Sequence, residues 1–222
     1  PIHYVGIGES QGSLDLDLYY THFSNKIIPN YDMPGQITYA NSEGNATTKG
    51  ISASISHQFT FPMAVNFSLN LQDASQRERN AANEWVEQPI EYASAWSGVS
   101  TLNYRIPGSG LTFAYTGRLM GPMQLPEVFD LDGNGVPLGS PRDQQSVPYS
   151  LHNIQVTKDF ESNIGVYVGV SNIFNYIQPV TPLTGFDDPN STPGFSPYFD
   201  TSYNFAPSVG REVYLGARFS IQ

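Results

Sequence analysis

The chain has 222 residues and no cysteine, and its 20 acidic residues against 10 basic ones give a net charge of −10 at pH 7. This charge excludes a nucleic-acid-binding role, because few cations are available to neutralise phosphates. The lack of cysteine excludes disulfides and thiolate metal sites. No apolar run approaches the roughly 20 residues of a transmembrane helix, whereas a membrane strand needs only about 9–11 alternating residues.

Strict alternation of apolar and polar residues begins near the N-terminus. Leu14, Leu16 and Leu18 occupy every second position, and Asp15 and Asp17 lie between them. Successive side chains of a strand point to opposite faces, so the leucines share one face while the carboxylates must meet water. The same pattern recurs along the chain. We expect strands with cores at 1–9, 13–24, 36–59, 63–76, 91–106, 111–120, 148–159, 164–175 and 211–221.

The connections between these strands alternate in length. Tight turns are expected at 9–12, 60–62, 107–110 and 160–163, and long polar loops at 26–34, 77–89, 121–146 and 177–210. Short and long connections in alternation are typical of an antiparallel up-and-down transmembrane β-barrel with periplasmic turns and extracellular loops. Aromatic residues near the predicted strand ends would form interfacial girdles. The alternative is a soluble β-sandwich binding module with one wet face.

The last predicted strand shows the clearest alternation. Val213, Leu215 and Ala217 fall on one face, and Tyr214 and Gly216 on the other. A strand with one apolar and one polar or small face is what a membrane barrel needs for closure, with lipid on one side and the lumen on the other. The inward face of the whole predicted sheet is polar. It carries Asp15, Asp17, Ser54, Ser56, Asn66, Ser68, Asn70 and Arg118.

Several segments resemble a known family. They are Leu-Asn-Tyr-Arg-Ile-Pro at 102–107, 111–118, 149–158, Asn-Ile-Phe-Asn within 168–176, 198–203 and the closing stretch 214–221. Together these are similar to the late barrel of TonB-dependent outer-membrane receptors, particularly those of Bacteroidetes-type bacteria. Barrels of that family have about 22 strands, so the resemblance implies that the expected strands, about nine, form a C-terminal portion of one barrel.

The resemblance also concerns what this chain lacks. No segment resembles the family's plug domain or TonB box, so residues 1–222 are expected to be barrel alone. An open sheet of this size exposes lipid-facing side chains and two unpaired edges, and should not be stable by itself. We therefore expect the remaining strands to come from a longer polypeptide or from partner chains.

The resemblance implies a function in energised import. An extracellular ligand would bind the loops and plug, and TonB, driven through ExbB and ExbD, would pull on the plug. The protein would lie in the outer membrane of a Gram-negative bacterium, in contact with lipid and lipopolysaccharide. The ligand is left open among siderophore, metal complex, cobalamin, glycan and peptide. The alternative is a passive porin-like or structural outer-membrane barrel, which would lack a plug.

Loops on a rigid scaffold commonly carry recognition, so the long loops 121–146 and 177–210 are the expected ligand-binding segments. One of them holds Asp130, Asp132 and Asn134 before Gly135. Oxygen-bearing side chains at alternate positions before a glycine resemble the start of an EF-hand calcium loop. The sequence thus predicts a candidate Ca²⁺ site there, with a plain Asp/Gly turn as the alternative. No other cofactor is expected.

Catalytic chemistry is not predicted. The four histidines, His3, His22, His57 and His152, are scattered along the chain. No nucleophile motif surrounds any of them, and their spacing fits no transition-metal site. We therefore expect no catalytic residue and no enzyme.

Overall fold

The computed structural model describes residues 3–7, 10–24, 27–30, 38–41, 44–80, 82–132, 135–160, 163–182 and 202–219. In these ranges no helix is long and apolar enough to cross a membrane. The strands are β1 His3–Ile7, β2 Ser10–Ser24, β3 Ile27–Asn30, β4 Thr38–Asn41, β5 Asn45–Gln58, β6 Met63–Arg79, β7 Trp85–Pro89, β8 Trp96–Ile106, β9 Leu111–Met120, β10 Asp130–Leu131, β11 Pro137–Leu138, β12 Tyr149–Asp159, β13 Ile164–Ser171 and β14 Glu212–Phe219.

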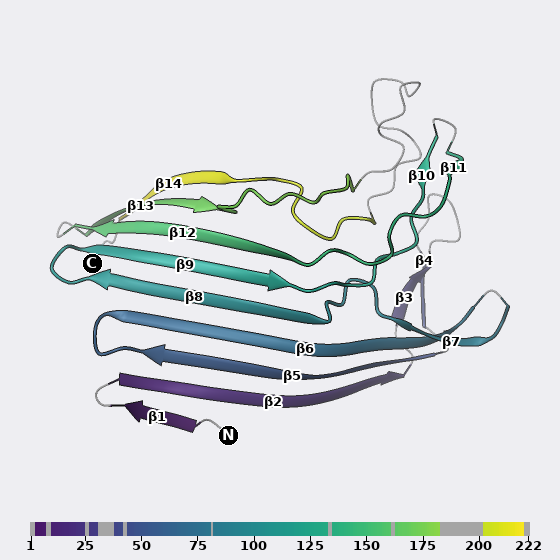
Figure 1. Ribbon diagram of the computed structural model, residues 1–222, viewed down its shortest axis with the longest axis horizontal. Coiled ribbons are helices and arrows are strands. Elements are labelled where there is room, and N and C mark those ends of the chain that lie inside the picture. The colour runs from purple at the N-terminus through teal and green to yellow at the C-terminus, as the bar shows by residue number, and fades with distance from the viewer. Residues whose placement is uncertain are drawn as a thin grey trace.

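The long strands form one antiparallel sheet in the order β1-β2-β5-β6-β8-β9-β12-β13-β14, and β7 pairs with β6 outside this path. Figure 1 shows the strands side by side in a single layer, with short turns at one end and long connections at the other. This up-and-down topology confirms the predicted fold class. The sandwich alternative is wrong, because the described long strands all belong to one sheet.

Three predicted strands differ from the structure by four or more residues at one end, whereas β2 starts and β6 ends three residues from the expected position. The segment expected at 36–59 is divided: β5 starts at Asn45, and β4 pairs with β3 in a separate hairpin. The strand expected at 91–106 starts at Trp96, because the Ala95 N–H donates to Pro122 O in a loop instead of a strand. The strand expected at 164–175 ends at Ser171, since Asn172 has a positive φ of 51°. Loop contacts set each of these ends.

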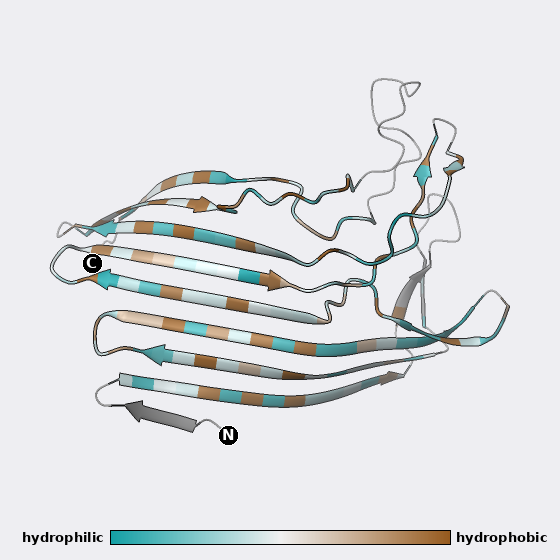
Figure 2. Ribbon diagram, viewed as in Figure 1, coloured by the Kyte–Doolittle hydropathy of each residue, from teal (hydrophilic) through white to brown (hydrophobic). Residues whose placement is uncertain are grey.

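Side chains alternate between an apolar face and a polar face of the sheet. On the apolar face, Leu14 lies beside Ile55, and Ile55 beside Phe67 on the next strand. On the polar face, Asp15 lies beside Ser54. Figure 2 shows the same alternation as brown and teal bands along the strands. The register places apolar residues beside apolar ones and polar residues beside polar ones on neighbouring strands. One face is therefore apolar and the other polar over most of the sheet's width.

The apolar face remains exposed in this chain. Leu18 is 75% exposed and Leu215 is 76% exposed, and such values on so many neighbouring strands fit contact with lipid rather than water. Both edges of the sheet are open as well, since among the described residues β1 pairs with β2 alone and β14 with β13 alone. The buried core lies elsewhere, among the connections at the end opposite the short turns.

Candidate functional site

The polar face carries a layer of short hydroxyl and amide side chains. Ser68 Oγ donates to Ser54 Oγ at 3.1 Å, joining β6 to β5. Asn66 Nδ2 donates to Thr101 Oγ1 at 2.9 Å, joining β6 to β8. These bonds satisfy polar groups within the wall itself. The register also places Asp15, Asp17, Ser56, Asn70 and Arg118 on this face, so the structure brings together the residues expected to face the lumen.

Some long side chains of the polar face reach past a neighbouring strand. Tyr19 of β2 crosses β5 at Gly50, and its hydroxyl donates to Asn70 Oδ1 of β6 at 3.0 Å. A Cβ at Gly50 would overlap the Tyr19 ring. The missing side chain is therefore what allows the ring to lie flat against the wall.

The same arrangement fastens the last strand. Tyr214 of β14 crosses β13 at Gly169, and its hydroxyl donates to Gln155 Oε1 of β12 at 3.1 Å. Arg218 Nη2 likewise reaches Asp159 Oδ1 of β12 at 3.0 Å. It passes Gly165, where a Cβ would lie 2.8 Å from that oxygen. The closing strand is thus tied to its second neighbour as well as its first.

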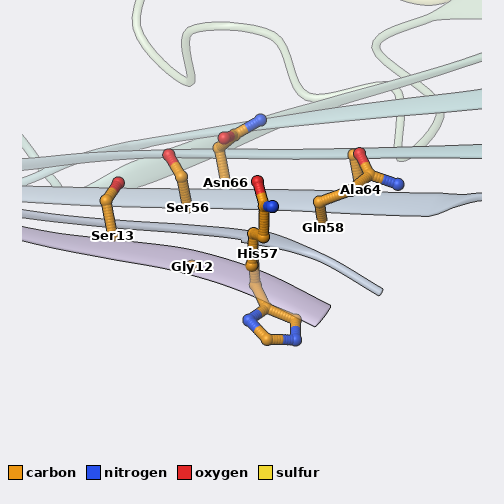
Figure 3. Close-up of a pocket in the computed structure, with 8 residues that line it drawn as sticks. Gly12, Ser13, Ser56, His57, Gln58, Ala64 and Asn66 are labelled. Atoms are coloured by element: carbon orange, nitrogen blue, oxygen red, sulfur yellow. The ribbon is translucent and has the colours of Figure 1, made fainter. Parts of the chain in front are cut away.

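A hollow near the short turns is lined by Gln11, Gly12, Ser13, Ser56, His57, Gln58, Ala64 and Asn66. Figure 3 shows Ser13, Ser56 and Asn66 pointing to one side of the sheet and His57 to the other. The His57 ring packs edge-on against Phe59, with centroids 4.5 Å apart. Its position on the apolar face, beside an aromatic residue, fits interfacial packing rather than chemistry.

The other described histidines also have structural surroundings. His152 Nδ1 and the Tyr115 hydroxyl form a 2.7 Å hydrogen bond, and Phe174 meets the His152 ring edge-on at 5.0 Å. His22 Nδ1 lies 3.3 Å from Thr47 Oγ1. None of these contacts includes a carboxylate that would orient a catalytic base. The side chain of His3 lies outside the described residues.

At the end opposite the short turns, three connections pack together. We call the described residues of the ranges 90–95, 121–148, 172–182 and 202–211 the loop unit. Its buried cluster consists of Met123, Leu125, Val128, Tyr203, Phe205 and Ala206. Met120 and Tyr149 pack against this cluster, and both lie on the polar face of the sheet by register with Ser97. The loop unit therefore folds inward over the polar face.

Hydrogen bonds fix this inward fold. The Tyr149 hydroxyl donates to Phe205 O at 3.1 Å. Gln178, only 7% exposed, donates through Nε2 to Tyr203 O at 2.9 Å and accepts at Oε1 from the N–H groups of Phe205 and Ala206 at 2.9 and 3.0 Å. A buried amide that is satisfied on both sides holds its loop in one conformation. Sequence reasoning missed Gln178, because a single glutamine in a long loop has no distinguishing pattern.

Tyr203 joins the two predicted ligand-binding loops. Its hydroxyl donates to Asp143 O at 2.8 Å, and the Arg142 guanidinium lies 5.1 Å from its ring centroid. Burial raises the pKa of the Tyr203 hydroxyl above its ordinary value, the Asp143 charge raises it further, and Arg142 lowers it. The phenol is therefore neutral over the physiological range.

Tyr92 joins the connection 90–95 to the rest of the loop unit. Its φ of 59° is rare for a bulky residue. The Tyr92 N–H donates to Gln124 O at 2.8 Å, and its hydroxyl donates to Ser202 O. One residue in a strained backbone conformation thus links all three connections of the loop unit. Nothing in the sequence distinguishes this tyrosine from the others.

The Asn-Ile-Phe-Asn segment forms the turn that ends β13. Asn172 Oδ1 accepts from Tyr176 N at 2.9 Å while its Nδ2 donates to Tyr176 O at 2.7 Å. Asn175, with a φ of 56°, accepts at Oδ1 from Arg211 N at 2.8 Å. Asparagine tolerates left-handed backbone and bonds nearby main chain. The motif therefore closes one strand and positions the start of the next.

The predicted calcium residues lie on the β10–β11 hairpin of the loop unit. Asp130 Oδ1 accepts from Arg142 Nε at 3.0 Å, and Asp132 Oδ1 accepts from Val136 N at 2.8 Å. Asn134 lies outside the described residues. Among those that are described, no three His, Asp or Glu side chains are grouped as metal ligands. Since Arg142 neutralises Asp130 here, a calcium ion would have to displace a guanidinium, and the site stays a prediction.

The fold and the polar, loop-capped face define a segment of an outer-membrane-type β-barrel. The family model described as "TonB dependent receptor-like, beta-barrel" matches residues 5–173, which is more than half of the chain. The chain therefore belongs to the TonB-dependent receptor β-barrel family, as the sequence resemblance predicted. The Bacteroidetes-type origin stays a prediction.

Solved structures agree with this fold. The FrpB iron transporter from Neisseria meningitidis (F3-3 variant) matches with a TM-score of 0.59 and 13% identity, covering 97% of this chain and 30% of that one. The ferric-catecholate import receptor Fiu from K12 E. coli matches with a TM-score of 0.56 and 13% identity, covering 94% of this chain and 27% of that one. The copper transporter OprC matches with a TM-score of 0.59 and 14% identity, covering 98% of this chain and 30% of that one. The chain thus spans under a third of these structures. No curated protein matches its sequence.

Proposed function

We propose that this chain forms part of the barrel wall and the extracellular loops of an outer-membrane importer in a Gram-negative bacterium, which takes up its ligand with energy supplied by TonB. The observation that carries this proposal is the loop unit folded inward over the polar face and fixed there by Tyr149 and Gln178. A rigid, inward-facing cap at the mouth of a polar channel suits ligand capture. The proposal includes no catalytic step.

The open edges of β1 and β14 imply that further strands complete the barrel, supplied by the rest of a longer polypeptide or by partner chains. TonB, with ExbB and ExbD, would act through a plug outside this chain. The related structures carry the words iron, ferric-catecholate and copper in their titles. Those words favour a metal complex or siderophore, while cobalamin, glycan and peptide stay open.

Within the importer, we propose that the ligand contacts the loops 121–146 and 177–210. Tyr203 and Arg142 support this assignment, because they bring the two loops into contact at one place. The acidic character of the chain suits a cationic ligand or one presented with a metal ion.

Uptake by cells tests the proposal. Cells producing the full-length protein would be given ⁵⁵Fe bound to a catecholate siderophore, ⁶⁴Cu²⁺ or ⁵⁷Co-cobalamin, in matched strains with and without tonB. We expect accumulation of at least one probe that depends on both the protein and tonB. Protein-dependent accumulation that persists without tonB would instead establish the passive porin-like alternative. Recovery of the protein from the soluble fraction would refute both.

A further inference from the structure

Strands β6 and β7 continue far beyond the lipid-facing band. The last large apolar residue of β6 on that face is Leu71, and the next row of the face contains Lys49 and Asp73, whose side chains form a 3.1 Å ion pair. From Leu71 to Arg79 the strand extends roughly 26 Å at about 3.3 Å per residue. Figure 1 shows the β6–β7 hairpin projecting past the other strands, and Figure 2 shows its hydrophilic character. The hairpin therefore stands above the membrane boundary at the long-loop end.

A basic and aromatic group lies on the outward side of this hairpin. Arg77 and Arg79 follow Leu71 at even spacing, so they continue the lipid-facing side of β6. Trp85 of β7 lies opposite Arg79 in the register. The guanidinium carbon lies 5.7 Å from the Trp85 ring centroid for Arg77 and 4.9 Å for Arg79. Both arginines are exposed, and Trp85 is 41% exposed.

The group is held in place by the hairpin itself. Arg79 Nη1 donates to Asn83 Oδ1 in the turn at 2.6 Å. The carboxylate of Glu87, which lies opposite Arg77, accepts from Ser75 Oγ at 2.8 Å. Stacking on an indole ring orients a guanidinium and leaves its N–H groups directed to the side. Arg79 is thus held by both the turn and the indole ring, and Arg77 lies over the same ring.

The distribution of charge gives this side a distinct character. The outward side of these strands carries three cations, Lys49, Arg77 and Arg79, and two carboxylates, Asp73 and Glu87. The opposite side of the hairpin carries Glu78 and no cation among its described residues. The whole chain, in contrast, has 20 acidic residues against 10 basic ones. Within the β6–β7 hairpin, the cations Arg77 and Arg79 therefore both lie on the side that faces laterally, over the membrane surface.

We propose that Arg77, Arg79 and Trp85 bind the phosphorylated sugar headgroup of lipopolysaccharide in the outer leaflet beside the barrel. The inference rests on the proposed outer-membrane location. Guanidinium groups bind phosphate in a planar, bidentate manner, and an exposed indole beside them offers a flat apolar surface to a sugar ring. The occupant lies to the side of the barrel, because these residues continue the lipid-facing side of β6.

Binding of lipopolysaccharide to the purified full-length protein tests this inference. The variant Arg77→Gln with Arg79→Gln is compared with Arg105→Gln with Arg118→Gln. This control removes the same charge from the polar face, because Arg105 follows Thr101 of that face on β8 at even spacing. Each protein in detergent is titrated with fluorescent lipopolysaccharide, and a heat-dependent shift in gel mobility checks that it is folded. We expect roughly tenfold weaker binding for the Arg77 and Arg79 variant, and unchanged binding for the control. Equal affinity of the two variants would overturn the proposal.

Further probes identify the source of the phosphate. Lipopolysaccharide stripped of its phosphates should bind the wild-type protein about as weakly as intact lipopolysaccharide binds the Arg77 and Arg79 variant. Vesicles of phosphatidylglycerol and millimolar inorganic phosphate should not displace the intact molecule. Displacement by either would overturn the assignment to a sugar headgroup. TonB-dependent uptake is scored separately: loss of lipopolysaccharide binding with uptake retained supports this site, whereas absence of uptake in the wild type rejects only the proposed function.

Discussion

Tyr214 reaches past strand β13 to hydrogen-bond Gln155 on β12, because Gly169 leaves space for the ring. The neighbouring pair has the reverse order, with Tyr167 of β13 lying over Gly216 of β14. Alternation alone predicts which residues face inward. It does not predict that a tyrosine and a glycine lie opposite each other, because this depends on the register between strands.

Replacing Gly169 should therefore disturb the closing strand. In Gly169→Val the new side chain would overlap the Tyr214 ring. We therefore expect overpacking to lower the free energy of unfolding by about 1–3 kcal/mol. Gly98→Ala is the control, since a Cβ at that buried strand glycine would meet its nearest atoms at 3.4 Å. The midpoint temperature of the heat-dependent gel shift of the full-length protein is the measurement. Equal midpoints for the two variants would contradict the steric explanation.

Tyr203 predicts a dependence of the loop unit on alkaline pH. Its folded pKa is raised above the ordinary value of 10.0, mainly by burial. The neutral phenol is therefore favoured in the fold, and its contribution to stability is complete below pH 10 and lost as pH rises through the folded pKa. We expect cleavage of the loop unit by subtilisin to accelerate above pH 10.

The variant Tyr203→Phe serves as the comparison. It cannot ionise, so its cleavage rate should start higher, because the hydrogen bond to Asp143 is lost, but should rise less between pH 9 and 11. Rates are normalised to an unstructured peptide at each pH. A parallel rise in both proteins would show that another group controls the effect.

Among the elements, the membrane-crossing strands were the most predictable part of the molecule. Period-two alternation predicted the ends of β2, β6, β9 and β12 to within three residues, because apolar and polar residues alternate along most of their length. Their ends were less predictable, since Asn45 and Trp96 begin strands where loop contacts cease. The buried cluster around Leu125 was missed, because apolar residues in a loop have no period to reveal that they pack together.

The β10–β11 hairpin carries the calcium prediction. Calcium at Asp130 and Asp132 must compete with Arg142, so we expect binding no tighter than about 10⁻⁴–10⁻³ M. Calorimetric titration of the full-length protein with CaCl₂ measures it. Asp132→Asn should weaken binding, whereas Asp73→Asn, on the outward side of β6, should not. An absence of binding heat at 10 mM CaCl₂ would leave the plain-turn alternative.

At the scale of the whole molecule, the long strands form one sheet with an apolar and a polar face, and no second sheet packs on it in the part of the chain that the structure describes. Its apolar face is exposed, with Leu215 at 76%, and its edges at β1 and β14 are unpaired among the described residues. The family resemblance, with its barrels of about 22 strands against about nine expected here, implied an incomplete barrel. The sequence did not predict the inward fold of the loop unit, which depends on contacts between residues as distant as Tyr149 and Phe205.

The open edges predict the behaviour of residues 1–222 produced alone. We expect aggregation after refolding in detergent and no heat-dependent gel shift, because lipid-facing surface and strand edges stay uncovered. The full-length protein, refolded in parallel, should show the shift. A discrete, heat-sensitive oligomer of residues 1–222 would mean that copies of the chain close the barrel together, and the importer would then have to be a multi-chain assembly.

The reciprocal arrangement of Tyr167 over Gly216 and Tyr214 over Gly169 also restricts how this sequence can diverge. A larger residue at either glycine is tolerated only after the facing tyrosine has become small, so the two positions of each pair should change together. In an alignment of relatives, 169 should covary with 214, and 167 with 216. Two coupled pairs on adjacent strands would then record the register of the closing strand in the pattern of substitutions alone.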